Sequence, residues 1–262
     1  MKFSANLGFL WADRPLPEAI RAAKAAGFAA VEMHWPYAVP VAEMRVVLEE
    51  TGLPVLGINT VRGAPGDNGL AALPGREAEA RAAIDQALDY AADIGSGRVH
   101  VMAGCADGDA ARTTFLENLR YGAARAETAG IGLVIEPLNR HDAPGYFLRT
   151  TDQAREIIDT LGQSSVRLMF DCYHVGRTEG DIVTRFQDLM PWIGHVQIAA
   201  VPDRGAPDHG ELDYRAILAG IAATGWDTPI GVEYKPDGDT DATLGWLPAL
   251  STIDGAAPLT GA

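Results

Sequence analysis

The chain has 262 residues, and 47% of them are hydrophobic, which is enough to build a large core. Its formal net charge is −14 and its Lys and Arg residues form no cluster, so we expect neither nucleic acid nor a membrane surface as a partner. No apolar run approaches the roughly 18 residues needed to cross a bilayer, and residues 1–6 lack the pattern of a signal peptide. We therefore expect a cytoplasmic protein that acts on a small molecule.

Short apolar segments alternate along the chain with longer, Ala-rich segments of helical character. In chain order, we predict a strand at 2–6, a helix at 15–26, a strand at 29–33, a helix at 42–51, a strand at 55–59, a helix at 75–94, a strand at 98–102, a helix at 110–129, a strand at 132–135, a helix at 151–161, a strand at 166–170, a helix at 181–190, a strand at 193–198, a helix at 213–223 and a strand at 229–232. Five of these helices stop at a glycine, the residue that most readily adopts the left-handed conformation of a helix end.

The alternation of strands and helices decides the predicted fold. Several strands, such as 133–135, are almost continuously apolar, which is typical of strands covered on both faces. Strands joined through helices imply right-handed βαβ units, and eight such units fit one (β/α)8 TIM barrel domain. We place that domain at about 1–250, followed by a flexible C-terminal tail at 251–262. An open doubly wound sheet is the alternative, but the first predicted strand is not followed by the Gly-rich nucleotide turn of that fold.

Four consecutive predicted strands, the fifth to the eighth, end on an oxygen donor. In chain order the donors are Glu136, Asp171, Gln197 and Glu233. The active site of such a barrel lies at the carboxyl ends of its strands, so these side chains should converge. Converging carboxylates that are buried without partners would be unstable, and a divalent cation resolves their repulsion. Oxygen ligands favour Mg²⁺ or Mn²⁺ over Zn²⁺.

Further polar residues near the strand ends are candidates for binding a substrate. They are His174, Arg204, Lys235, Asn6 and His100. His174 follows the sixth strand and is expected to bind a substrate oxygen. Arg204 and Lys235 follow the last two strands and are expected to hold a carboxylate. The structural alternative is that the strand-end acids pair separately with cations of the neighbouring loops, and that the other polar groups satisfy the mouth of the barrel.

Several segments resemble a known family. Ile135-Glu136-Pro137-Leu138-Asn139 and Asp171-Cys172-Tyr173-His174 resemble the xylose isomerase-like barrel superfamily, and Gly194-His195-Val196-Gln197-Ile198 and Glu233-Tyr234-Lys235-Pro236 resemble its hydroxypyruvate isomerase family. The likeness runs from about residue 2 to residue 247. It implies the same four metal ligands, with Glu136 and Glu233 as the acid/base pair. Related ketose epimerases usually have His as the third ligand, so Gln197 favours the isomerases.

The resemblance also implies a reaction. The expected enzyme is a metal-dependent aldose–ketose-type isomerase that interconverts hydroxypyruvate and 2-hydroxy-3-oxopropanoate (tartronate semialdehyde) through an enediolate. The Glu-Pro-Leu-Asn motif of strand five favours hydroxypyruvate over the longer 2-oxo-tetronates. A 2-oxo-tetronate isomerase, a ketose 3-epimerase, a metal-dependent endonuclease and a non-catalytic binding protein are the alternatives. The charge of −14 and the six histidines argue against the endonuclease. A homo-oligomer is among the states that the sequence allows.

Overall fold

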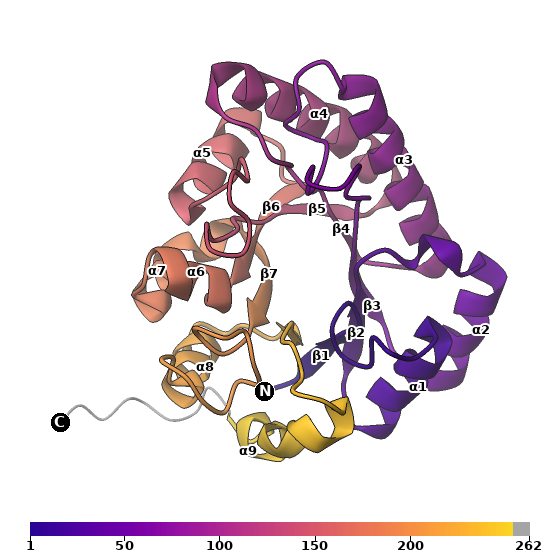
Figure 1. Cartoon of the computed structure of the whole chain (residues 1–262), viewed down its shortest axis with the longest axis vertical. Helices are drawn as coiled ribbons and strands as arrows, with labels where there is room; N and C mark the ends of the chain where they lie inside the picture. The colour runs from indigo at the N-terminus through magenta and orange to yellow at the C-terminus, as the bar shows by residue number, and fades with distance from the viewer. Residues whose placement is uncertain (254–262) are drawn as a thin grey trace.

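The computed structural model describes residues 1–253, which form a closed barrel of eight parallel strands surrounded by helices (Figure 1). The strands are β1 (Phe3–Asn6), β2 (Ala30–Met33), β3 (Val55–Asn59), β4 (Arg98–His100), β5 (Gly132–Ile135), β6 (Val166–Asp171), β7 (Ile193–Ile198) and β8 (Ile230–Val232). Each strand pairs with the next in the chain, and β8 pairs with β1 to close the ring. The predicted (β/α)8 TIM barrel is confirmed.

The helices cover the outside of the barrel. They are α1 (Leu16–Ala25), α2 (Val41–Thr51), α3 (Glu77–Ile94), α4 (Gly108–Ala129), α5 (Thr151–Leu161), α6 (Cys172–Thr178), α7 (Ile182–Leu189), α8 (Tyr214–Ala223) and α9 (Leu247–Ser251). Four of them end at a glycine in the left-handed conformation, as predicted, namely Gly52, Gly95, Gly130 and Gly162. Within the described part of the chain, no helix has both the length and the apolar character that crossing a bilayer requires.

Near the site, one predicted boundary is wrong and one helix is missing from the predicted elements. The fourth strand ends at His100 instead of residue 102, because from Met102 onward the backbone N–H groups turn to side chains: Met102 donates to Thr60 Oγ1 and Ala103 to the hydroxyl of Tyr146. Helix α6 is absent from the predicted elements. It begins directly after β6 because Asp171 Oδ1 accepts a hydrogen bond from the backbone of Tyr173 and caps its first turn.

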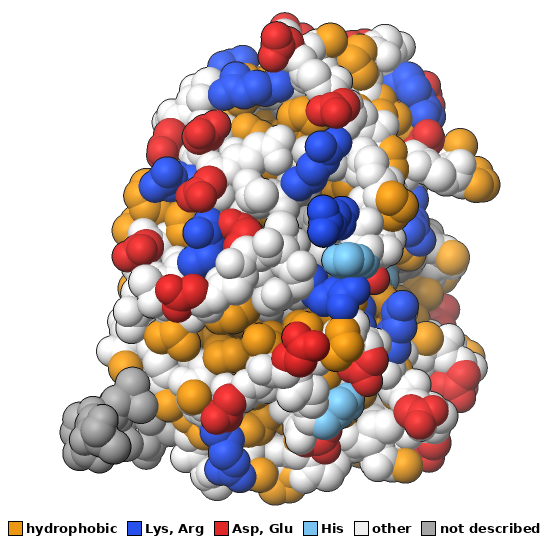
Figure 2. Space-filling model, turned by 60° about the vertical axis from the view of Figure 1, so that its left-hand side comes forward, with side chains coloured by type: hydrophobic (Ala, Val, Ile, Leu, Met, Phe, Trp, Pro, Cys, Tyr) orange, Lys and Arg blue, Asp and Glu red, His pale blue; other side chains and the backbone are white. Residues whose placement is uncertain are grey.

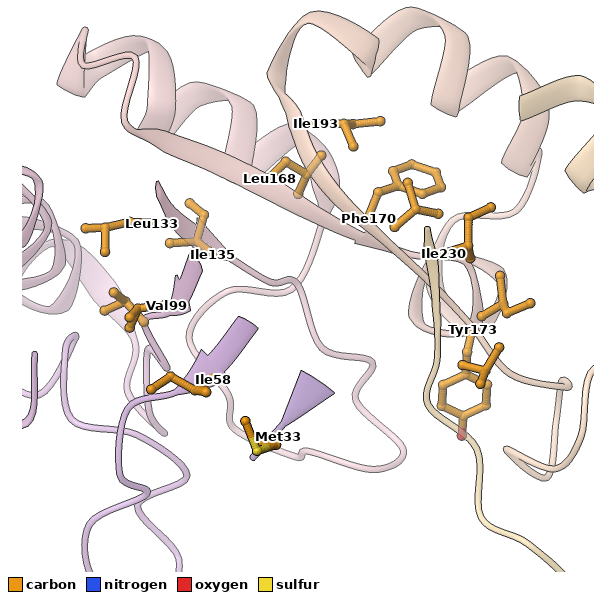
Figure 3. Close-up of a cluster of buried hydrophobic side chains, with 14 of the residues drawn as sticks. Met33, Ile58, Val99, Leu133, Ile135, Leu168, Phe170, Tyr173, Ile193 and Ile230 are labelled. Atoms are coloured by element: carbon orange, nitrogen blue, oxygen red, sulfur yellow. The ribbon is translucent and has the colours of Figure 1, made fainter. Parts of the chain in front are cut away.

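The core that fixes the strand ends lies between the barrel and its helices (Figure 3). Leu168 and Phe170 of β6 belong to it, and the ring of Phe170 meets that of Phe186 in α7 edge-to-face at 5.6 Å. Met169 lies between them in the strand and faces the barrel interior, where it lines a small cavity. Alternate residues of each strand therefore point to the helices and to the interior, and packing on both sides fixes the position of the strand end.

The two ends of the described chain meet beneath the barrel. The amino group of Met1 donates to the backbone carbonyls of Ser251 and Ile253. The predicted flexible tail, 251–262, lies outside the described residues except for its first three positions.

Candidate active site

The strand-end donors lie at one end of the barrel, where two of them line a pocket of about 280 Å³ and Gln197 lines a smaller cavity of the barrel interior. Register places Asp171 of β6 directly beside Gln197 of β7. Glu136 and Glu233 follow β5 and β8, and both line the pocket. All four side chains are almost completely buried. Consecutive strands thus deliver three acids and one amide to a space that is largely shielded from water.

The buried acids leave several oxygens without a partner. Glu136 Oε1, Asp171 Oδ2 and Gln197 Oε1 accept no hydrogen bond among the described residues. Glu136, Asp171 and His174 each offer a ligand atom, and these atoms lie within 4.8 Å of one another. Buried polar atoms are nearly always satisfied, so unpartnered oxygens at this spacing fit a bound cation. A donor set dominated by oxygen suits a hard divalent ion.

The electrostatics of Glu136 and Asp171 support the same interpretation. Burial raises the pKa of Asp171 to about 7, against the opposing charge of Arg204. Burial, followed by the charges of Glu233 and Asp171, raises the pKa of Glu136 well above its ordinary value. Each carboxyl group therefore resists ionisation, and a divalent cation bound between them would favour the ionised form of both.

Glu233 is the best satisfied of the acids. Its Oε1 accepts from Asn6 Nδ2 at 3.1 Å and lies 2.8 Å from His34 Nε2, while Oε2 pairs with Arg204. Burial opposes its charge, but Arg204 and His34 outweigh burial and hold the pKa of Glu233 well below the ordinary value. The predicted residue Asn6 thus meets the predicted acid directly.

His174 points a proton donor at the acids. The backbone N–H of Asn139 donates to its Nδ1 at 3.0 Å, so this nitrogen must act as the acceptor. Burial lowers the pKa of His174 to about 3, which keeps the ring neutral, and its single proton then sits on Nε2. Nε2 lies 3.6 Å from Asp171 Oδ2 and 3.8 Å from Glu136 Oε1. A protonated nitrogen cannot bind a metal, so this geometry favours a role for His174 as a donor to a substrate oxygen.

Comparisons with known proteins decide the family. The sequence model of the xylose isomerase-like TIM barrel matches residues 20–250. A 2-oxo-tetronate isomerase from Cupriavidus necator is 44% identical, over 94% of this chain and 97% of its own length. A hydroxypyruvate isomerase from Escherichia coli is 34% identical, over 94% of this chain and 98% of its own. The chain belongs to the hydroxypyruvate isomerase family of xylose isomerase-like TIM barrels.

A solved structure has the same fold as this isomerase. A protein from Brucella melitensis, described as an AP endonuclease of family 2, superimposes with a TM-score of 0.91 and 35% identity. The match covers 95% of this chain and 98% of that one. The whole barrel fold is therefore shared with a protein of known structure.

The remaining predicted residues of the isomerase fall into two groups. Arg204 lies in the pocket with its guanidinium between the rings of Phe9 and Tyr173, 5.0 and 5.1 Å from their centroids. His100 also lines the pocket, and its Nδ1 is 3.7 Å from Glu136 Oε2. Lys235 is exposed and lies outside the pocket lining, and its backbone N–H donates to the carbonyl of Arg204. Five of the predicted residues therefore line the pocket, Asp171 and Asn6 contact members of that set, Gln197 lines the adjoining interior cavity, and Lys235 lies apart.

Other residues of the isomerase site are absent from the predicted set. Glu32 and His195 are buried in the barrel interior beside Gln197, and Arg62 and Asn68 line the rim of the pocket. Glu32 and His195 do carry a sequence signal, because each interrupts a strand expected to be apolar on both faces. Arg62 and Asn68 carry none, because they lie in the irregular segment between β3 and α3.

Proposed function

We propose that the protein isomerises short 2-oxo acids that bear a hydroxyl group on C3, with the help of Mg²⁺ or Mn²⁺. The ligands are Glu136, Asp171, Gln197 and Glu233. The observation that carries the proposal is the group of buried oxygens without partners, which belong to three of these four residues. Membership of an isomerase family supports the reaction class.

The reaction needs the net transfer of one proton from carbon to carbon and of one proton from oxygen to oxygen. A proton leaves C3 and another is delivered to C2, while the hydroxyl proton passes from O3 to O2. When bound, the divalent ion supplies Lewis-acid polarisation of the C2 carbonyl and the C3 hydroxyl. Glu136 and Glu233 both line the pocket, and we assign them the carbon-bound protons. His174 donates from Nε2 to a substrate oxygen, where negative charge develops.

Two substrates contain this reacting unit. Hydroxypyruvate, the three-carbon acid, is favoured by the motif that follows strand five. 2-Oxo-tetronate, the four-carbon acid, is favoured by the 44% identity to the Cupriavidus necator enzyme of that name. One additional carbon changes binding by only about 1–3 kcal/mol, so both acids belong in the first assay.

The reaction is tested by substrate turnover with a defined metal. The purified protein is given hydroxypyruvate, 2-oxo-tetronate or a free ketose, with Mg²⁺ or Mn²⁺, and product formation is followed by a coupled reductase. We expect turnover of an acid and its loss after thorough chelation. Activity that survives chelation would exclude the metal, and turnover of the ketose alone would show an epimerase or a sugar isomerase.

Two variants test the acid/base pair. Glu136→Gln and Glu233→Gln should each lower kcat by about 100-fold or more, the usual contribution of a positioned acid or base. Glu49→Gln, which removes an exposed acid of α2, serves as the matched control. Full activity in both site variants would overturn the assignment.

The same proposal includes a cytoplasmic location and a small-molecule partner. An endonuclease function, as described for the Brucella melitensis protein, is less well supported because the net charge of −14 opposes binding to a phosphate backbone. A homo-oligomer stays a prediction, and size-exclusion chromatography with light scattering tests it.

A further inference from the structure

Two arginines line the pocket, and they differ in their partners. The guanidinium of Arg204 pairs with Glu233 Oε2 and lies 3.8 Å from Asp142 Oδ2, so acids of the site already balance its charge. Arg62 lies at the rim and has no carboxylate within 4.0 Å among the described residues. It is the one arginine of the described pocket lining whose charge is not balanced by a carboxylate.

Neutral groups hold the guanidinium of Arg62 in place. Its Nε and Nη2 both donate to Asn68 Oδ1, the former at 3.0 Å. Its central carbon lies 5.2 Å from the centroid of the Trp35 ring, and the Trp35 indole is fixed by donating to the carbonyl of Thr60 at 3.0 Å. A guanidinium has five N–H donors, and at least three of those on Arg62 have no protein acceptor. The side chain is thus oriented without being neutralised.

A short series of contacts links Arg62 to the reacting end of the pocket. Trp35, under the guanidinium, adjoins His34, and their ring centroids are 5.0 Å apart. His34 Nε2 in turn lies 2.8 Å from Glu233 Oε1. Arg62 and Glu233 line the same pocket, so a small molecule in it has an acid at one side and an unpaired cation at the other.

The charge of the whole protein makes such a cation necessary for an anionic substrate. The net charge of −14 repels anions at long range. Figure 2 shows a face of the molecule on which Lys and Arg side chains are interspersed with Asp and Glu. Attraction must therefore come from a cation within the pocket, where a guanidinium can bind a carboxylate through two parallel hydrogen bonds.

We propose that Arg62 binds the substrate carboxylate and thereby selects 2-oxo acids over uncharged ketoses of similar size. This inference rests on the proposed function, because it assigns a position to the carboxylate of the same substrates. It reassigns a role that was expected of Arg204 or Lys235. Arg204 then remains with Glu233 at the reacting end.

The test compares Arg62→Gln with Arg140→Gln. Arg140 is exposed in the segment that follows β5, at the same end of the barrel, but does not line the pocket, so both variants change the net charge equally. Arg62→Gln should raise the KM for hydroxypyruvate and 2-oxo-tetronate by about tenfold or more, the effect of losing a charged hydrogen bond, with little change in kcat. Arg62→Lys should recover part of the loss, because it keeps the charge but not the paired donors.

Hydroxyacetone, which has a methyl group in place of the carboxylate of hydroxypyruvate, is the uncharged probe. Its inhibition constant should be the same in wild-type protein and in Arg62→Gln. Equal effects of Arg62→Gln and Arg140→Gln on KM, or an equal loss of hydroxyacetone binding in Arg62→Gln, would overturn the assignment to Arg62. Failure of the wild-type protein to turn over any 2-oxo acid would instead overturn the proposed function, so the two failures are distinguishable.

Discussion

The side-chain amide of Gln197 donates a hydrogen bond to Glu32 Oε2, with 2.8 Å between nitrogen and oxygen. Both residues are buried inside the barrel, and His195 Nε2 lies 3.0 Å from the same carboxylate oxygen. A carboxylate only accepts hydrogen bonds, so Glu32 selects the NH₂ side of the amide and leaves Gln197 Oε1 without a partner. Glu32 thus determines that Gln197 offers an oxygen, as a ligand to a hard cation must.

Replacing Glu32 by Gln should weaken metal binding without unfolding the barrel. The new amide can donate to Gln197 Oε1 as well as accept from Nε2, so the orientation of Gln197 is no longer fixed. Loss of a residue that orients a ligand typically lowers metal affinity about 10–100-fold, and we expect that range for Mn²⁺, measured by titration calorimetry or by the spin resonance of the free ion. Glu49→Gln is the charge-matched control. Unchanged Mn²⁺ affinity in Glu32→Gln would contradict the role of Glu32.

Gly231→Ala tests the same arrangement from another strand. A Cβ atom at position 231 would lie 2.4 Å from Glu32 Oε1 and 2.8 Å from Gln197 Cγ, so one of these side chains must move. We expect Mn²⁺ affinity to fall as it does in Glu32→Gln. Gly245→Ala, where an added Cβ meets no atom within 4 Å, is the control and should bind Mn²⁺ normally.

The sequence predicted the strand-end donors because one simple rule places them. A residue that ends a parallel strand lies at the carboxyl end of the barrel whatever the details of packing, and Glu136 and Asp171 obey that rule. The contact between Glu32 and His195 could not be predicted, because it depends on how side chains from β2 and β7 cross the interior of a closed barrel. Lys235 lies beyond the end of β8, where the alternation of a strand no longer decides the direction of a side chain.

Three histidines, His100, His174 and His209, should titrate in two separate ranges. Burial lowers the pKa of His100 to about 4 and that of His174 to about 3. His209 is exposed, and its hydrogen bonds to Asp203 and Asp208 raise its pKa above the ordinary value. As the pH falls from 8 to 5, the His209 ring should therefore take up its proton first, while the two buried rings stay neutral.

Nuclear magnetic resonance of ¹⁵N-labelled histidine follows each ring, with His174→Gln to assign the buried signal. The His174 spectrum should also show the proton on Nε2, since Nδ1 accepts from the backbone of Asn139. A proton on Nδ1, or a His174 titration near pH 6.5, would contradict the donor role.

Metal binding should release protons, and more of them at lower pH. Burial raises the pKa of Asp171 to about 7, and it raises the pKa of Glu136 well above its ordinary value. At pH 6 the carboxyl group of Asp171 in the free site therefore keeps its proton, and a cation must displace it. Affinity for Mn²⁺ should therefore rise with pH, and the number of protons released should fall by about one between pH 6 and pH 8, as Asp171 ionises in the free site.

Calorimetric titrations in two buffers of different ionisation enthalpy measure that number directly. Asp171→Asn removes one of the two groups and should lower the release at pH 6 by about one proton, provided that it still binds Mn²⁺. Binding without proton release at pH 6 would show that the carboxyl groups of the free site are already ionised.

Phe170 connects the stability of the barrel to its site. It is fully buried between β6 and α7, and it directly precedes Asp171, so its packing holds the strand end that carries a proposed ligand. Phe170→Ala should lower the free energy of unfolding by about 3–5 kcal/mol, measured by denaturant titration, because it removes a ring and leaves a cavity. Val46→Ala, at a position that is 62% exposed, should change the free energy of unfolding by less than about 0.5 kcal/mol.

The same variant tests whether Phe170 fixes the site. Folded Phe170→Ala protein should bind Mn²⁺ more weakly than wild type does. Phe186→Ala, which removes the ring that faces Phe170 from the helix, should lower stability with a smaller effect on Mn²⁺ affinity. Equal effects of the two variants on Mn²⁺ affinity would show that the strand end is held by its backbone pairing with β7 and not by the packing of Phe170.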